Sequence, residues 1–135
     1  MTQIPLISII DDDDLFRASM QEFVRSLGFS VCAFASAASF LQSTEVAETR
    51  CMILDGQMPE MSGISLQEHL SQRGIDIPII FITAFPDEGM KMRALNVGAV
   101  CYLHKPLDLR GPLLRECIEA ALDRGTGPAP SWRRC

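Results

Sequence analysis

Residues 51–54 (CMIL) form an apolar run that leads directly into a carboxylate at Asp55, and Gly56 follows in a stretch of turn-forming residues. A short apolar run bounded by turn residues is typical of a buried strand. Strands without polar alternation belong to parallel sheets that are covered on both faces. An acid at the end of such a strand lies where α/β sheets bind ligands. Asp is also a common turn residue, so this stretch alone leaves open that Asp55 merely caps the turn.

The rest of the chain alternates between apolar runs and segments with helical periodicity. Strands are predicted at residues 6–10, 30–34, 51–55, 78–83 and 100–105, and helices begin near residues 16, 36, 63, 87 and 113. We expect the last helix to bury Leu113, Leu114, Cys117, Ile118, Ala121 and Leu122. Alternating strands and helices imply right-handed crossovers and a parallel sheet. The predicted fold class is α/β, a flavodoxin-like doubly wound five-stranded sheet of order 2-1-3-4-5 with five helices in a three-layer sandwich.

Polar side chains stand at the carboxyl ends of four of the five predicted strands. They are Asp11 and Asp12 after the first strand, Asp55 at the third, Thr83 at the fourth and Lys105 at the fifth. Parallel strands bring these ends to one edge of the sheet, and strands 1, 3 and 4 are neighbours in the predicted order. The sequence therefore predicts that three acids, a hydroxyl and an amine meet on one rim.

The chemistry of this rim points to phosphoryl transfer. Three crowded carboxylates repel one another, and a divalent cation relieves the repulsion. Hard oxygen ligands in this number suit Mg²⁺. A carboxylate such as Asp55 can act as a nucleophile that forms an aspartyl phosphate, and the Lys105 ammonium would stabilise charge on the phosphoryl oxygens.

Size, charge and cysteine content limit the remaining function classes. The 135 residues fit a single domain, and the net charge of −5 disfavours direct nucleic-acid binding by this chain. The five cysteines are widely spaced without a CxxC pair, which favours reduced thiols and a cytoplasmic location. The sequence shows neither a signal-peptide pattern nor an apolar run of membrane-spanning length. We expect a domain at residues 1–124 and a flexible tail or linker start at residues 125–135.

Four motifs together resemble the receiver domains of two-component response regulators, most closely FixJ-type receivers with the CheY-like fold. They are residues 9–13 (IIDDD), 54–63 (LDGQMPEMSG), 82–84 (ITA) and 98–106 (GAVCYLHKP). The resemblance covers about residues 6 to 124. It implies a phospho-acceptor switch in a phosphorelay, rather than an enzyme, whose partner is a sensor histidine kinase.

The resemblance also assigns roles residue by residue. It implies that Asp55 is phosphorylated and that Asp12 binds Mg²⁺ directly, with Asp11 acting largely through water and the backbone carbonyl of Gln57 as a further ligand. Lys105 matches the phosphate-binding lysine, which precedes a typically cis bond to Pro106. Thr83 and Tyr102 match the switch pair. A homodimer or an output partner is expected on the face made by the fourth helix, fifth strand and fifth helix.

Four residues near the phospho-acceptor are expected to modulate its chemistry: Gly56, Gln57, Ala84 and Phe85. Gly56 stands where relatives carry a larger residue, which suggests a looser loop. Phe85 stands where many relatives carry a polar residue. A phenyl ring there cannot orient a hydrolytic water and would exclude it, so we expect slow autodephosphorylation.

Two alternatives stay open at this point. A haloacid-dehalogenase-like phosphohydrolase also uses a strand-end Asp with Mg²⁺, but it needs a second Asp at the position that Gln57 occupies. A phosphorylation-independent binding module is the other. The receiver is expected either to stand alone or to be part of a longer regulator.

Overall fold

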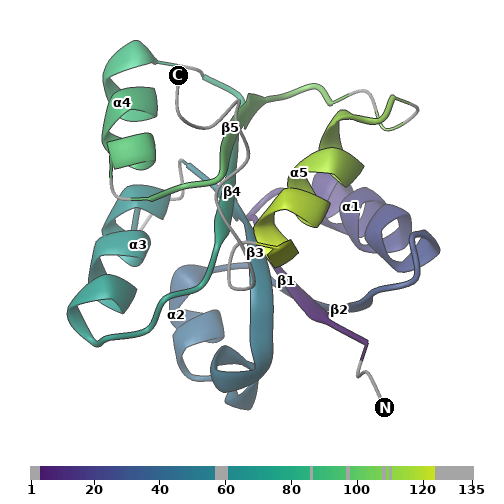
Figure 1. Ribbon diagram of the computed structural model, residues 1–135, viewed down its shortest axis with the longest axis horizontal. Coiled ribbons are helices and arrows are strands. Elements are labelled where there is room, and N and C mark those ends of the chain that lie inside the picture. The colour runs from purple at the N-terminus through teal and green to yellow at the C-terminus, as the bar shows by residue number, and fades with distance from the viewer. Residues whose placement is uncertain are drawn as a thin grey trace.

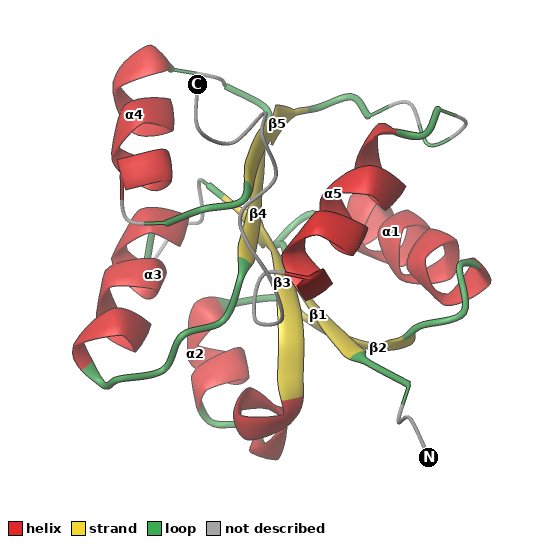
Figure 2. Cartoon of the chain, in the orientation of Figure 1, coloured by secondary structure: helices red, strands yellow, loops and turns green. Residues whose placement is uncertain are grey.

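The computed structural model describes residues 4–56, 61–85, 87–96, 98–107, 109 and 111–123. Its strands are β1 (Leu6–Ile10), β2 (Ser30–Phe34), β3 (Thr49–Asp55), β4 (Ile79–Thr83) and β5 (Cys101–His104). Its helices are α1 (Asp14–Ser26), α2 (Ala37–Leu41), α3 (Gly63–Gln72), α4 (Glu88–Asn96) and α5 (Leu113–Asp123), with a short 3-10 helix, η1, at Thr44–Glu48. Strands and helices alternate along the chain as the sequence predicts (Figure 2).

The five strands form one parallel sheet in the order β2-β1-β3-β4-β5. This is the predicted doubly wound order. Because β3 lies between β1 and β4, the carboxyl end of β3 has the ends of β1 and β4 on either side. The acids that follow β1 and end β3 are thereby brought to the same edge.

Helices cover both faces of the sheet, with α1 and α5 on one side and α2, α3 and α4 on the other (Figure 1). Alternate residues of each strand face opposite layers. In β3, Ile53 packs in the cluster that includes Met20 of α1 and Ile118 of α5, whereas Leu54 packs in the cluster that includes Phe40 of α2. The core therefore has two parts, separated by the sheet.

Polar side chains set the starts of several helices. Asp13 caps α1 by accepting hydrogen bonds from the backbone N–H groups of Leu15 and Phe16. Ser36 and Ser62 cap α2 and α3 in the same manner. At the other end of α1, Gly28 has a φ of 99°, a left-handed conformation that glycine adopts at little cost.

The predicted strand boundaries lie within two residues of the observed ones, and two details differ from the prediction. The third strand begins at Thr49 rather than at residue 51, because the buried Thr49 hydroxyl bonds to the Ser8 hydroxyl and to the Glu45 carbonyl, both at 2.7 Å. Leu113 is exposed rather than on the inner face of α5, since it opens the helix before the first buried position at Leu114.

The predicted tail at residues 125–135 lies outside the described residues. Within the part of the chain that the structure describes, no helix has the length and apolar character needed to cross a membrane.

Candidate functional site

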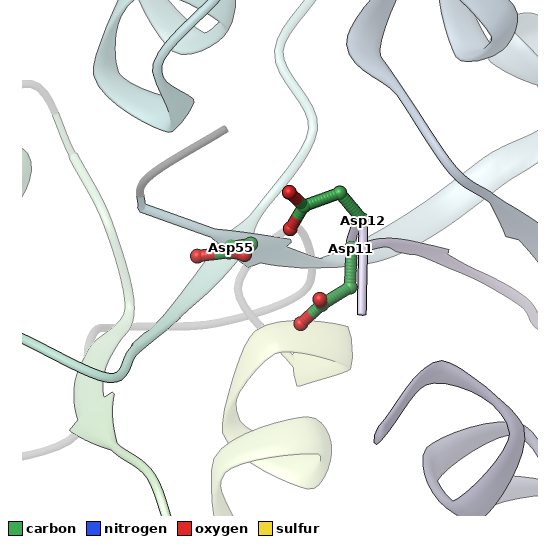
Figure 3. Close-up of side chains that lie close together, drawn as sticks. All are labelled: Asp11, Asp12 and Asp55. Carbon is green, nitrogen blue, oxygen red and sulfur yellow. The ribbon is translucent and has the colours of Figure 1, made fainter. Parts of the chain in front are cut away.

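Three carboxylates meet at the carboxyl edge of the sheet. Asp11 and Asp12 follow β1, and Asp55 ends β3. One oxygen from each lies within 4.8 Å of the others, and the side chains of Asp11 and Asp12 both extend toward the side where Asp55 lies (Figure 3). Asp11 is 2% exposed and Asp55 is 5% exposed, whereas Asp12 is open to solvent. The cluster therefore has two buried members and one accessible member.

Lys105 places a positive charge among these acids. Its Nζ lies 2.9 Å from Asp11 Oδ2 and 3.9 Å from Asp55 Oδ2. The backbone fixes the position of Lys105, because its N–H donates to the Thr83 carbonyl at 2.8 Å and a cis bond joins it to Pro106. Buried carboxylates are tolerated when they are paired, so this ammonium explains how Asp11 can lie inside the protein.

Thr83 ends the neighbouring strand and is fully buried. Its hydroxyl oxygen accepts a hydrogen bond from the Phe85 N–H at 3.2 Å. Because the hydroxyl oxygen is the acceptor in this bond, the hydroxyl proton can be donated to another acceptor.

Two backbone hydrogen bonds hold Gly56, and the expected looseness of the loop that follows it stays a prediction. The Gly56 N–H donates to the Ile82 carbonyl at 3.0 Å, and its carbonyl accepts from the Gly63 N–H at 3.3 Å. Both bonds tie the residue to buried elements, so its backbone is held despite the missing side chain. Gln57 lies outside the described residues, and its predicted roles stay predictions.

Tyr102 lies on β5 directly beside Phe81 of β4, with ring centroids 6.4 Å apart. It is half-buried, and its hydroxyl accepts from the Asp87 N–H at 3.4 Å. That distance is long for an N–H···O bond, so the hydroxyl is weakly held. Tyr102 thus lies two strands away from Asp55, with β4 between them, and packs against the part of the core on the α4 side of the sheet.

Ala84 and Phe85 both lie at the exposed start of the β4–α4 connection. The Phe85 ring is 70% exposed, so it is not packed over the acids. Whether the ring excludes water from Asp55 stays a prediction.

The acidic cluster could hold a metal ion. Formally, three carboxylates and one ammonium leave two negative charges, which a divalent cation would balance. Oxygen donors alone favour a hard ion over a soft one. The donor set therefore fits the Mg²⁺ that the sequence predicts, on charge and on ligand type.

Comparison with known families decides the class of this site. The model of the response regulator receiver domain matches residues 7–116, which include all three acids, Thr83 and Lys105. The chain belongs to the response regulator receiver family. Its function is accordingly that of a signalling module in two-component phosphorelays, as the sequence predicts. The match gives no support to the phosphohydrolase alternative.

Curated relatives of this receiver domain extend well beyond the part that matches this chain. Nodulation protein W of Bradyrhizobium diazoefficiens is 40% identical over 119 residues, which are 88% of this chain and 52% of that protein. Response regulator protein TodT of Pseudomonas putida is 42% identical over 117 residues, 87% of this chain and 51% of that protein. The receiver domain therefore spans about half the length of the curated relatives it matches.

Solved structures agree with the fold. The FixJ-N crystal structure superimposes with a TM-score of 0.80 at 31% identity, covering 94% of this chain and all of that chain. Response regulator StyR gives a TM-score of 0.82 at 38% identity, covering 90% of this chain and 61% of that one. The CheY-like architecture predicted for the receiver domain is confirmed.

Two neighbours of the acids, Phe16 and Arg17, are not among the site residues predicted from the sequence. The Phe16 ring lies under the Lys105 ammonium, 4.2 Å from its Nζ. The Arg17 Nη1 donates to the Asp11 carbonyl at 2.7 Å. Their position in the sequence could have indicated this, because both residues lie in the first turn of the helix that follows the acids.

Proposed function

We propose that Asp55 accepts a phosphoryl group from a sensor histidine kinase. The observation that supports this most is the buried Asp55 carboxylate beside two further acids and within 3.9 Å of the Lys105 ammonium. An Asp55 oxygen forms the new bond to phosphorus, and the phosphorus–nitrogen bond of the donor phosphohistidine breaks, with its electron pair going to the ring nitrogen. Lys105 and the Thr83 hydroxyl then contact the phosphoryl oxygens.

Asp11, Asp12 and Asp55 would hold Mg²⁺ in this proposal, and the Gln57 carbonyl would complete the ligand set. The ion would supply positive charge that stabilises the phosphoryl oxygens. Asp12 would bind the ion directly and Asp11 largely through water, next to the Asp55 carboxylate. Lys105, paired with Asp11 at 2.9 Å, is positioned to turn toward Asp55.

We propose further that phosphorylation changes the face made by α4, β5 and α5. The Thr83 hydroxyl moves toward the phosphoryl oxygens, and the weakly held Tyr102 moves inward into the space behind it. A local charge change thus biases an element with two positions. Lys91, Arg93 and the exposed Met92 and Leu95 of α4 are part of this face, where an output partner or a second copy would bind.

The receiver unit is proposed to occupy residues 1–124, with residues 125–135 as a tail or linker. None of the four described cysteines forms a disulfide, which suits a proposed location in the reducing cytoplasm. Gln57, Ala84 and Phe85 are proposed modulators of phosphoryl lifetime. The role of Phe85 is tested by comparing how fast labelled Phe85→Glu and labelled wild type lose the phosphoryl group after the donor is removed.

Labelling with a small phosphoryl donor tests the central proposal. Intact mass and a phosphate-affinity gel follow the addition of one phosphoryl group in the presence of Mg²⁺. Asp55→Asn should abolish labelling, and Asp12→Ala should slow it and raise the Mg²⁺ concentration required. Glu68→Gln, which removes an exposed acid from α3, is the matched control and should label like wild type. Labelling of Asp55→Asn at the wild-type rate, or many turnovers of a phosphomonoester per protein, would contradict the proposal.

A further inference from the structure

The Lys105 ammonium has an aromatic neighbour as well as two carboxylates. Its Nζ lies 4.2 Å from the centroid of the Phe16 ring, in addition to 2.9 Å from Asp11 and 3.9 Å from Asp55. The Lys105 side chain is only 14% exposed. A largely desolvated cation over a ring face is attracted by the negative charge density of that face.

Phe16 is held firmly in this place. Its N–H donates to the capping carboxylate of Asp13 at 3.2 Å, and its half-buried ring packs against the core cluster shared by the sheet, α1 and α5. The next residue, Arg17, bonds to the Asp11 carbonyl and to Asp14. The first turn of α1 is thereby fixed to the end of β1, and the ring is fixed with it.

We propose that Phe16 is a positioning residue for Lys105 in phosphoryl transfer. A ring face attracts the ammonium but offers no lone pair, so it holds the cation near Asp55 without competing with the phosphoryl oxygens as an acceptor. A carboxylate in the same place would retain the ammonium. The attraction also changes gradually as the cation moves across the face, so the ammonium can shift from Asp11 toward Asp55 while it stays over the ring.

This inference rests on the proposed function of Asp55 and adds a role to a residue outside the family motifs. The loss expected from removing the aromatic face is about threefold to thirtyfold in the rate of Asp55 labelling, the range of a cation–π contact at partly and fully desolvated sites. Phe16→Leu removes the face and keeps an apolar side chain in the core, whereas Phe16→Tyr keeps the face.

A double-mutant cycle separates positioning from packing. The four proteins are wild type, Phe16→Leu, Lys105→Met and the double variant, and the readout is the initial rate of labelling by a small donor at fixed Mg²⁺. Phe16→Leu should slow labelling about threefold to thirtyfold when Lys105 is present and less than about twofold in the Lys105→Met protein. Phe16→Tyr should label like wild type.

Two supporting measurements cover the cases in which a variant unfolds or labels too slowly for the double-mutant cycle. Urea unfolding shows that each variant is folded, and Phe16→Met replaces Phe16→Leu if the latter unfolds. Where Lys105→Met labels too slowly to follow, the affinity of the same four proteins for the phosphoryl mimic beryllium trifluoride supplies an equilibrium cycle with the same expected pattern.

The outcomes distinguish this inference from the proposed function. If wild type does not label on Asp55, the proposed function fails. If wild type labels and Phe16→Leu labels equally fast, the inference alone is overturned. The same holds if Phe16→Leu slows labelling by the same factor with Lys105 as with Met at position 105, because the ring then has only a packing role.

Discussion

Gly56 directly follows β3, and Gly63 is the first residue of α3. The two glycines differ in the space that a Cβ atom would have. A Cβ on Gly63 would lie 2.7 Å from the Asp55 carbonyl oxygen and 2.7 Å from Phe81 Cε1. A Cβ on Gly56 would meet its nearest atom, Thr83 Cβ, at an ordinary 3.5 Å. Gly63 therefore lets the start of α3 approach the end of β3 closely, whereas nothing in the spacing requires glycine at position 56.

Gly63→Ala and Gly56→Ala form a matched pair that tests this difference in stability. Gly63→Ala should lower the free energy of unfolding by about 1–3 kcal/mol, the usual cost of overpacking. Gly56→Ala should change it by less than about 1 kcal/mol, because its methyl group fits and alanine restricts the unfolded chain. Urea unfolding monitored by circular dichroism measures both. Equal losses in the two variants would show that the close approach at Gly63 does not limit packing.

The site could be predicted from sequence because strand ends converge in a parallel sheet. Asp11, Asp55 and Lys105 were expected at one edge because each follows or ends a strand of the same parallel sheet, and the structure brings them together. Phe16 could not be assigned in that way. Its helical spacing with other apolar residues predicts core packing, which it also has, and only the three-dimensional path of Lys105 shows the second contact.

Elements were predicted more reliably than their ends. The first two strands have the predicted bounds, since apolar runs and a change to helical periodicity mark both. The start of β3 was missed because polar Thr49 and Arg50 precede its apolar run. One of the two hydrogen bonds of the buried Thr49 hydroxyl joins it to Ser8, which is distant in sequence. Leu113 was misplaced because periodicity does not show which turn of a helix first contacts the core.

At the scale of elements, the link between the Asp55 site and α4 should depend on the Thr83 hydroxyl. Wild type bound to beryllium trifluoride should show changed amide chemical shifts through α4 and around Tyr102. Thr83→Ser retains the hydroxyl and should respond similarly, whereas Thr83→Ala should lose most of the change in α4. The measurement is a pair of nitrogen–proton correlation spectra for each protein, with and without the mimic.

Binding of the mimic must be verified separately in the Thr83 variants. Unchanged shifts near Asp55 in Thr83→Ala would mean that the variant fails to bind, and the concentration of mimic must then be raised. A full α4 response in saturated Thr83→Ala would rule out the hydroxyl as the connection between the two elements.

The whole molecule has a built-in reporter of global unfolding in Cys51. This thiol is fully buried in the central strand, and burial raises its pKa from 9.0 to about 12. The thiolate is the form that attacks alkylating reagents. The native Cys51 side chain is unreactive near neutral pH, because it is shielded by burial and stays protonated. Because the unfolded thiol ionises first, this group also lowers stability as pH rises above about 9, an effect complete near pH 12.

Alkylation of Cys51 should therefore require unfolding of the whole domain. In a Cys32→Ser, Cys135→Ser background, peptide mass spectrometry should show a Cys51 labelling rate that rises with urea with the slope of equilibrium unfolding. Between pH 7 and 9 the rate should follow ionisation of an ordinary thiol rather than one with a pKa near 12. A rate independent of urea would instead indicate local opening around β3.

The sheet that separates the two halves of the core also separates two routes for evolutionary change. Ile53 and Leu54 are consecutive residues, yet a substitution at one alters the layer of α1 and α5 and a substitution at the other alters the layer of α2, α3 and α4. Duplicated genes for such a domain could therefore diverge in the helices of one layer, and so acquire new partners, while the opposite layer keeps its ancestral packing. For the same reason, protein engineers could redesign the core layer on one side of the sheet and leave the layer on the other side unchanged.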